Sequence, residues 1–282
     1  TLIIEDTDGN ILEQGTDYDV AYQNNINAGT AAGAISTARQ EGDKFEILSG
    51  VFNGFTTGTP IAILIRNENT QSKDYSEIAV TARPGHADFS AECKYHGFQD
   101  YRGGGHFSGR ITAGIVAAGA ICISALAEKG IKIGTHIAEC AGIPDRNFEN
   151  IGEDIDSLNG KLFAVLDEEK GRKMEETILA AKNEQDSVGG ILETAIIGIP
   201  AGIGEPYFDS IESQLAHFLF SIPAVKGVEF GAGFGFAKMR GSEGNDPFRV
   251  DENGNMNNVF YLFCIFTGLS LYTYATTNIM MF

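Results

Sequence analysis

Blocks of hydrophobic and polar residues predict a mixture of strands and helices through the middle of the chain. Residues 45–66 hold two short β-rich runs around the turn-rich joint GFTTGTP, which predicts a hairpin or a pair of adjacent strands. Residues 112–129 are rich in alanine and carry apolar residues at helical spacing up to Lys129 and Gly130. We expect a buried helix there.

The pattern continues with alternating strands and helices. Residues 131–143, IKIGTHIAECAGI, and residues 190–200 predict strands. The acidic segment 151–187 predicts an exposed helix around MEETILAAKNE, with Glu175 and Glu176 in its first turn. Sheet and helix layers packed together are expected, in an α+β or an α/β arrangement.

A last helix and strand follow a glycine-rich turn. Residues 210–222 show the apolar stripe of an amphipathic helix, with Asp209 or Ser210 as N-cap. Residues 202–206 form the turn before it, a structural role, and residues 226–237, KGVEFGAGFGFA, predict a strand.

The two ends of the chain differ from this middle part. Residues 1–33 predict three short strands with DG and NN turns, and they resemble a fragment of a bacterial cell-surface β-sandwich repeat. Residues 259–282 carry no charge and are long enough to cross a bilayer. Their Thr, Tyr and Asn content and the absence of flanking Lys or Arg favour core strands or a non-native tail over a membrane anchor.

Composition and charge narrow the classes of function. The 282 residues, 43% of them hydrophobic, are enough for one large domain. A net charge of −18 argues against nucleic acid and anionic membranes as partners. The four cysteines are widely spaced and form no CxxC pair, so we expect reduced, mostly buried thiols in a cytoplasmic protein.

Three of the five histidines, His86, His96 and His106, lie ten residues apart. Compact zinc sites usually use close ligand pairs, so this spacing predicts loops or strand ends side by side and no metal site. Basic residues accompany the histidines and would suit a small anionic ligand: Arg83, Lys94, Arg102 and Arg110.

Several long motifs occur in the order found in one enzyme family. They are RPGHAD (83–88), DYRGGGHFSGR (100–110), QDSVGG (185–190), GIPAGIGEPYFDS (198–210), SIPAVKGVEFGAGF (221–234) and GSEGND (241–246). Residues 36–258 resemble chorismate synthase, the last enzyme of the shikimate pathway. The chain is therefore expected to comprise an atypical β-rich segment (1–35), this core (36–258) and a divergent apolar tail (259–282).

The resemblance implies a lyase that uses reduced FMN to eliminate phosphate and a ring proton from 5-enolpyruvylshikimate 3-phosphate, giving chorismate. NADPH or a separate reductase would reduce the flavin. The implied fold is an α+β, β-α-β sandwich with helices between antiparallel or mixed sheets. The implied assembly is a homotetramer.

The resemblance also assigns roles to residues of this chain. His86 matches the histidine that protonates the reduced flavin, and a histidine titrates in the range such a role needs; a turn histidine is the alternative. His96 matches no family residue and is expected to be structural. The other assignments are His106, Phe107, Ser108 and Ala224 to FMN, and Arg110 and Arg39 to the substrate. Arg110 has the alternative of a surface ion pair.

Two parts of the chain depart from the family pattern. No Gly-Glu-Ser-His-Gly motif precedes residue 36, and NAGTAAGAISTA (27–38) places Ala28 and Ala34 where arginines are expected. After Asn258 the family's glycine-rich segment, flavin loop and late aspartate are replaced by VFYLFCIFTG. These departures predict impaired turnover and leave two alternatives. One is a catalytically inactive oligomeric or flavin-binding protein on the same core, and the other is an adhesion module supported by residues 1–33 alone.

Overall fold

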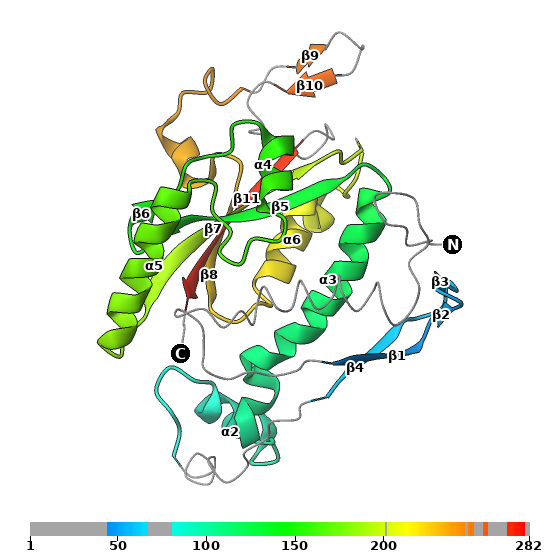
Figure 1. The fold of residues 1–282 in the computed structure, drawn as a ribbon, viewed down its shortest axis with the longest axis vertical. Coiled ribbons are helices and arrows are strands. Elements are labelled where there is room, and N and C mark those ends of the chain that lie inside the picture. The colour runs from blue at the N-terminus through cyan, green and yellow to red at the C-terminus, as the bar shows by residue number, and fades with distance from the viewer. Residues whose placement is uncertain are drawn as a thin grey trace. The chain divides into compact units, whose positions relative to one another are not determined.

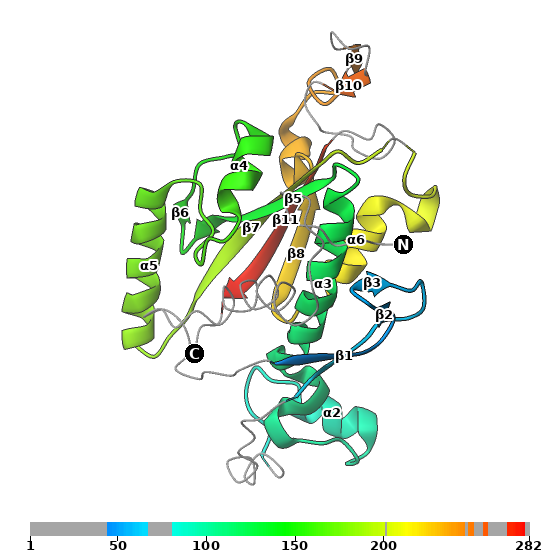
Figure 2. The same ribbon diagram turned by 45° about the vertical axis from the view of Figure 1, so that its right-hand side comes forward.

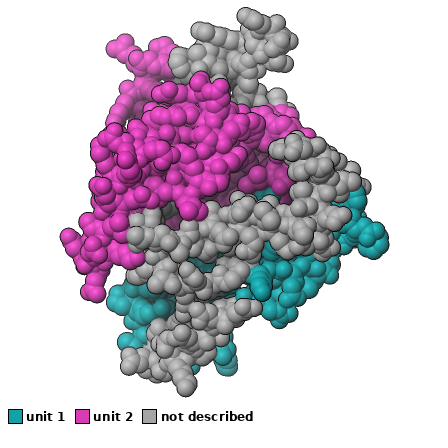
Figure 3. Space-filling model, viewed as in Figure 1, with its two compact units in different colours: residues 1–26, 39–120 teal, residues 27–38, 121–282 magenta. Residues whose placement is uncertain are grey.

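The computed structural model describes residues 44–66, 81–200, 202–245, 248–250, 256–258 and 270–279, whose helices and strands are labelled in Figure 1. The chain divides into two compact units, coloured separately in Figure 3. Unit 1 comprises residues 1–26 and 39–120, and unit 2 comprises residues 27–38 and 121–282. The predicted strands over 1–33 lie outside the described residues.

Unit 1 contains a strand pair, as residues 45–66 predict. Strands β1 (Phe45–Ser49) and β4 (Ala62–Ile65) are antiparallel, with Phe45 opposite Ile65. The turn-rich joint between them forms the smaller pair β2 (Val51–Phe52) and β3 (Phe55–Thr56). The first part of α3 (Thr112–Ala127) packs on this sheet, because Ala117 contacts Phe45, Ile63 and Ile65.

Helix α3 is present where the sequence predicts it, but the prediction of a buried helix is wrong. Ala117, at 3% exposure, is its one buried residue, while Ile115, Val116 and Ile123 are exposed. Apolar residues surround the whole helix, so the sheet that Ala117 contacts cannot cover all of them. Residues Gly109–Ala127 have the length and composition to cross a membrane, which core helices of soluble proteins also have.

The histidine-rich part of unit 1 consists of one helix and two short 3-10 turns. These are α2 (Asp88–Tyr95), η2 (Arg102–Phe107) and η3 (Gly109–Ile111). The ten-residue histidine spacing therefore spans a helix rather than three adjacent loops or strand ends.

Unit 2 is built on a five-stranded sheet in the order β6-β5-β7-β11-β8. Every neighbouring pair is antiparallel, which decides between the two fold classes in favour of α+β. The sheet contains the strands predicted over 131–143 and 190–200. The strands are β5 (Lys132–Cys140), β6 (Ile143–Pro144), β7 (Val188–Ile197), β8 (Val225–Phe230) and β11 (Ser270–Ile279).

The apolar C-terminal segment contributes an inner strand, as one of the two favoured interpretations predicts. The backbone of β11 pairs with β7 from Ser270 opposite Ile197 to Ile279 opposite Val188, and with β8 on its other side. Two shorter strands, β9 (Phe248–Val250) and β10 (Met256–Asn258), pair with each other.

Helix α5 (Glu168–Asn183) begins earlier than its acidic pattern suggests. Asp167 is the N-cap and accepts hydrogen bonds from the N–H groups of Glu169 and Lys170. Glu168 and Glu169 therefore occupy the first turn, and the prediction of Glu175 and Glu176 there is wrong. Gly171 in these early turns leaves room for Val165, because an added Cβ would lie 2.6 Å from Cγ2 of Val165.

Helices α4 (Ile151–Leu158) and α5 lie on one side of the sheet and α6 (Ile211–Leu219) on the other (Figure 2). The sequence pattern missed α4, which is short and packs on β5. Gly134 of β5 gives it room, because an added Cβ would lie 2.8 Å from Ile155 of α4. Next to α5, Cys140, Val165, Met174 and Ile178 form a buried cluster.

Two further predictions need correction. The strand predicted over 226–237 ends at Phe230, because Gly231 and Gly233 take positive φ angles and a 3-10 turn, η5 (Gly233–Lys238), follows. The thiols are not mostly buried, since Cys140 is buried but Cys93 and Cys122 are exposed. Cys264 lies outside the described residues.

Candidate active site

An ion pair closes the RPGHAD loop of unit 1. Nε and Nη2 of Arg83 each donate to a different carboxylate oxygen of Asp88 at 2.9 Å, and the Arg83 backbone N–H donates to Asp88 as well. Hydrogen bonding from the Arg83 guanidinium lowers the pKa of Asp88 to about 2. The two ends of the loop are thus joined across residues 84–87.

His86 lies within this loop and is exposed. Gly85 turns the chain with φ +72°, and Nδ1 of His86 lies 3.1 Å from the carbonyl oxygen of Pro84. Since a carbonyl only accepts, Nδ1 carries the proton of a neutral ring, and Nε2 is then the nitrogen that can accept or deliver a proton. The loop therefore presents one ring nitrogen for acid–base chemistry.

His96 caps the end of α2, in agreement with its expected structural role. It takes the left-handed conformation with φ 54°, and its backbone N–H donates to the carbonyl oxygen of Glu92. Its ring is exposed.

The glycine run before His106 depends on one glycine for its shape. Gly105 has φ +52°, and a Cβ there would lie 2.5 Å from the carbonyl oxygen of Asp100. His106 and Phe107 follow at the end of η2, and both are exposed. Ser108 caps η3 by accepting a hydrogen bond from the backbone N–H of Arg110.

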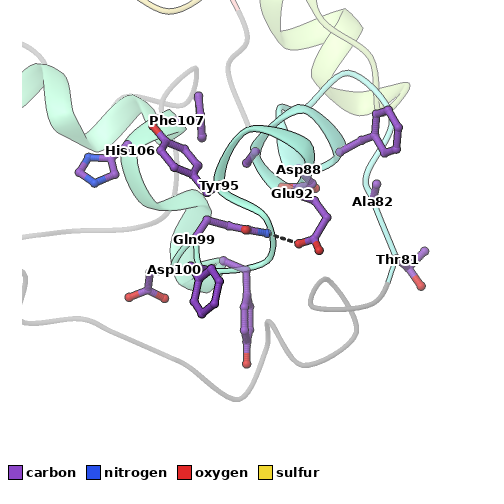
Figure 4. Close-up of a pocket in the computed structure, with 13 residues that line it drawn as sticks. Thr81, Ala82, Asp88, Glu92, Tyr95, Gln99, Asp100, His106 and Phe107 are labelled. Atoms are coloured by element: carbon purple, nitrogen blue, oxygen red, sulfur yellow. Dashed lines mark hydrogen bonds between the residues drawn. The ribbon is translucent and has the colours of Figure 1, made fainter.

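A cavity of about 550 Å³ lies beside this segment, entirely within unit 1 (Figure 4). It brings together His106 and Phe107 of the predicted flavin residues. His86, Ser108 and Arg110 are not part of its lining. The lining residues are Thr81, Ala82, Asp88, Phe89, Ala91, Glu92, Tyr95, Phe98, Gln99, Asp100, Tyr101, His106 and Phe107.

Both aromatic rings and carboxylates line the cavity. The rings of Tyr95 and Phe107 are tilted against each other with centroids 6.4 Å apart. Gln99 donates to Glu92 at 2.7 Å, the contact drawn in Figure 4. Arg102 binds Asp100 and lowers the pKa of that carboxylate to about 2.

The residues around the cavity fit the ring system of a flavin. Its volume is in the range of small-molecule sites, and aromatic side chains suit a planar ligand. The carboxylates in the lining do not suit the flavin phosphate. Backbone N–H groups near Gly109, where an added Cβ would meet nothing within 4 Å, are the donors that would bind it.

The remaining predicted residues are not among those that line this cavity. The Arg110 guanidinium donates to the carbonyl oxygen of Arg66 at 3.4 Å. Ala224 belongs to unit 2, where it is half-buried with φ +71° in the turn between α6 and β8. At the other end of α6, Ser210 is the N-cap, because its side chain accepts a hydrogen bond from the backbone N–H of Ser213. Arg39 lies outside the described residues.

Sequence reasoning missed most of the lining. Tyr95, Phe98 and Tyr101 recur every three residues, a spacing that by itself is typical of a helix face. Glu92 and Gln99 carry no motif signal. In the ranges that the structure describes, no group of three or more His, Cys, Asp or Glu residues is placed to hold a metal ion.

Comparisons with known proteins agree with the motifs. The family model for chorismate synthase matches residues 21–260. A chorismate synthase of Dehalococcoides mccartyi is 46% identical over 79% of this chain and 61% of its own length. One of Korarchaeum cryptofilum is 48% identical over 77% of this chain and 60% of its own length.

A solved structure, titled "Crystal Structure of Chorismate Synthase", matches the fold with a TM-score of 0.71 and 26% identity over 93% of this chain and 75% of that chain. The chain spans about three fifths of the length of the two curated relatives. The family match begins before the first motif that we identified and covers most of the chain. The chain belongs to the chorismate synthase family.

Proposed function

We propose that this chain catalyses a chorismate synthase reaction, the 1,4-elimination of phosphate from 5-enolpyruvylshikimate 3-phosphate to give chorismate. In this reaction a C–O bond to phosphate and a ring C–H bond break, and a ring double bond forms. The observation that carries the proposal is the RPGHAD loop, closed by Arg83 and Asp88 with His86 between them. It supports an acid–base role because Nε2 is the nitrogen not engaged with Pro84.

Reduced FMN, when bound, would supply electron density to the substrate with no net oxidation or reduction. His106, Phe107 and Ser108 would hold it, with Ala224 as a further contact. At the cavity, Phe107 offers the face of its ring and His106 offers a polar edge. Ser108 fixes the backbone at the start of η3. His86 would hold the exchangeable proton at Nε2.

Arginines would bind the anionic substrate. Arg110 is the last residue of the DYRGGGHFSGR motif, and a guanidinium binds phosphate through two parallel N–H donors. Arg39 is the second proposed contact. A substrate that brings its own negative charge to a chain of net charge −18 needs such local cations.

A second candidate function is flavin binding without turnover. The observation that favours it is the absence of a Gly-Glu-Ser-His-Gly motif from the 282 residues, which removes the histidine expected to serve the leaving phosphate. Losing one such donor typically costs ~100 to 1,000-fold in rate. We therefore propose turnover below that of a family member with both histidines.

The proposed setting is the cytoplasm, with a homotetramer as the assembly and NADPH as a source of electrons for the flavin. The described cysteines are free thiols, which suits a reducing compartment.

The experiment that tests the proposal is an anaerobic assay with reduced FMN and the enolpyruvyl phosphate, following chorismate absorbance and released phosphate together. We expect both products in equal amounts and neither without flavin. His86→Ala should abolish the residual rate, whereas His96→Asn should keep it, because asparagine tolerates the left-handed cap. Flavin binding with no product would favour the second candidate, and an unchanged rate in His86→Ala would remove His86 from the mechanism.

A further inference from the structure

A buried histidine in unit 2, which the proposed reaction does not use, lies between two carboxylates. His136 of β5 is 1% exposed, with Nδ1 2.8 Å from Asp145 Oδ2 and Nε2 2.8 Å from Glu193 Oε2. Both carboxylate side chains are buried, at 0% and 4% exposure. We call these three residues the His136 triad.

The geometry determines how many protons the triad holds. A neutral imidazole has one N–H and one lone pair, so one of its two contacts would set a lone pair against a carboxylate oxygen. An imidazolium has an N–H at both nitrogens and satisfies both acceptors. The triad therefore contains one proton more than a neutral histidine with two carboxylates.

Backbone N–H groups also donate to the Asp145 carboxylate. Besides His136, this carboxylate accepts hydrogen bonds from the backbone N–H groups of Leu166 at 2.7 Å and Asp167 at 2.8 Å. Backbone donors favour a charged carboxylate. The extra proton therefore lies between Nε2 of His136 and Glu193, and the imidazole holds it because it is the more basic of the two groups.

Charged groups from every described element around His136 support this assignment. Glu193 lies directly opposite His136 in the β5–β7 register. The edge of the Phe148 ring lies against the imidazole, with centroids 4.8 Å apart. The charged groups are Glu193 from β7, Asp145 and Arg146 from the connection after β6, Asp154 of α4, which binds Arg146, and Asp167 before α5. Carboxylates outnumber cations among them, which favours a protonated ring.

The triad also connects the sheet to the start of a helix. Hydrogen bonds run from Glu193 through His136 to Asp145 and on to the backbone of Leu166 and Asp167. Asp167 in turn caps α5. Two further contacts join the sheet to this segment independently of Asp145: the Ile137 backbone N–H of β5 donates to the Ala164 carbonyl oxygen, and Cys140 of β5 packs with Val165.

We propose that the His136 triad is a proton-dependent latch, in which a buried imidazolium between Glu193 and Asp145 keeps the Asp145 carboxylate in place to accept hydrogen bonds at the start of α5. Loss of the extra proton as the pH rises would set a ring lone pair against a carboxylate. The bonds from Leu166 and Asp167 to Asp145 then weaken, while the Ile137–Ala164 backbone bond and the pairing of β5 with β7 remain.

The first test uses the unmodified protein. Ring ¹⁵N chemical shifts of His136 should show protons on both nitrogens at neutral pH. Amide hydrogen exchange at Leu166 and Asp167 should accelerate roughly tenfold beyond the intrinsic base-catalysed rate as that proton is lost, because each loses a bond to a charged acceptor that is held in place. Amides in the centre of β7 should remain protected. A neutral ring at neutral pH, or exchange that follows the intrinsic rate throughout, would overturn the proposal.

The second test removes the need for the extra proton. In Glu193→Gln the amide can donate to Nε2 while Nδ1–H donates to Asp145, so the ring should be neutral and the alkaline step in exchange should vanish. Asp156→Asn, which removes an exposed carboxylate paired with Lys132, is the matched control and should keep the step. Persistence of the step in Glu193→Gln would contradict the latch, and if that variant does not fold, the ring shifts of the unmodified protein decide alone.

Discussion

Arg83 and Asp88 determine the shape of the loop that carries His86. Their two side-chain hydrogen bonds form a planar fork, and both side chains are less than one third exposed. Ion pairs of this geometry stabilise a fold more than ion pairs that make a single contact at the exposed surface. The exposed Arg66–Glu46 pair in the same unit has one such contact and is the natural comparison.

Unit 1 should therefore lose stability in acid through Asp88. The pKa of Asp88 is lowered to about 2. Its contribution to the free energy of unfolding is therefore complete above the ordinary aspartate pKa near ~3.9 and is lost as the pH falls through about 2. The contribution is at most ~2 kcal/mol. Denaturant unfolding at a series of acidic pH values should show this slope in the unmodified chain and not in Asp88→Asn.

Glu46→Gln is the control for that experiment, since its ion pair is solvent-exposed and should change the acid slope little. An equal loss of slope in both variants would show that the Arg83–Asp88 geometry has no special effect.

The sequence predicted the site only in part at this scale. The RPGHAD motif and the glycine run were identified from the amino-acid sequence. The structure shows a local role for each. The sequence did not identify Glu92, Gln99 and Tyr101 as residues that line the cavity. The cavity arises from packing between α2 and η2, and such packing leaves no fixed spacing in the sequence.

At the scale of elements, α5 shows how a cap can override a polar pattern. The segment 168–173, EEKGRK, contains no apolar residue, and its glycine argues against helix. Asp167 begins the helix nevertheless, because its carboxylate satisfies two of the N–H groups that a helix start leaves unpaired.

Asp167→Ala should consequently destabilise unit 2 by ~1 kcal/mol, the usual effect of losing an N-cap. Those backbone bonds also lower the pKa of Asp167, so the cap should weaken as the pH falls into the acidic range. Denaturant unfolding followed by circular dichroism measures the loss. Glu176→Ala, an exposed change within the same helix, should leave the free energy of unfolding nearly unchanged, and equal effects would contradict the cap.

Elements with strong periodicity were predicted well, and their ends were predicted poorly. Strands β5 and β7 and helix α6 follow their patterns. Helix α4 was missed because eight residues give too few turns for a clear apolar stripe. The burial of α3 was misjudged because the hydrophobicity of a helix does not show which other elements pack against it.

At the scale of the molecule, the sheet of unit 2 depends on a strand from near the chain's C-terminus. β11 lies between β7 and β8, so the pairing joins residues separated by most of unit 2. The sequence could suggest a core strand there, but its position depends on long-range pairing that hydrophobicity does not encode.

A chain ending at residue 269 should therefore lose the cooperative unfolding of unit 2, because β7 and β8 would each be left with an unpaired edge. The loss should be a large part of the ~5–15 kcal/mol typical of a domain. Thermal unfolding by circular dichroism measures it. A chain ending at Ile279, which keeps all of β11, should unfold like the full chain, and the same behaviour in the shorter chain would contradict the described sheet.

Equilibrium titration with reduced FMN under anaerobic conditions tests most directly the proposal that the segment around His106 and Phe107 holds a flavin. The full chain should bind saturably, and Phe107→Ala should bind roughly tenfold more weakly because a ring contact is lost. Phe52→Ala, which removes an exposed ring of unit 1 outside the cavity, should bind like the full chain. No binding by the full chain, or equal binding by the full chain and Phe107→Ala, would contradict the account.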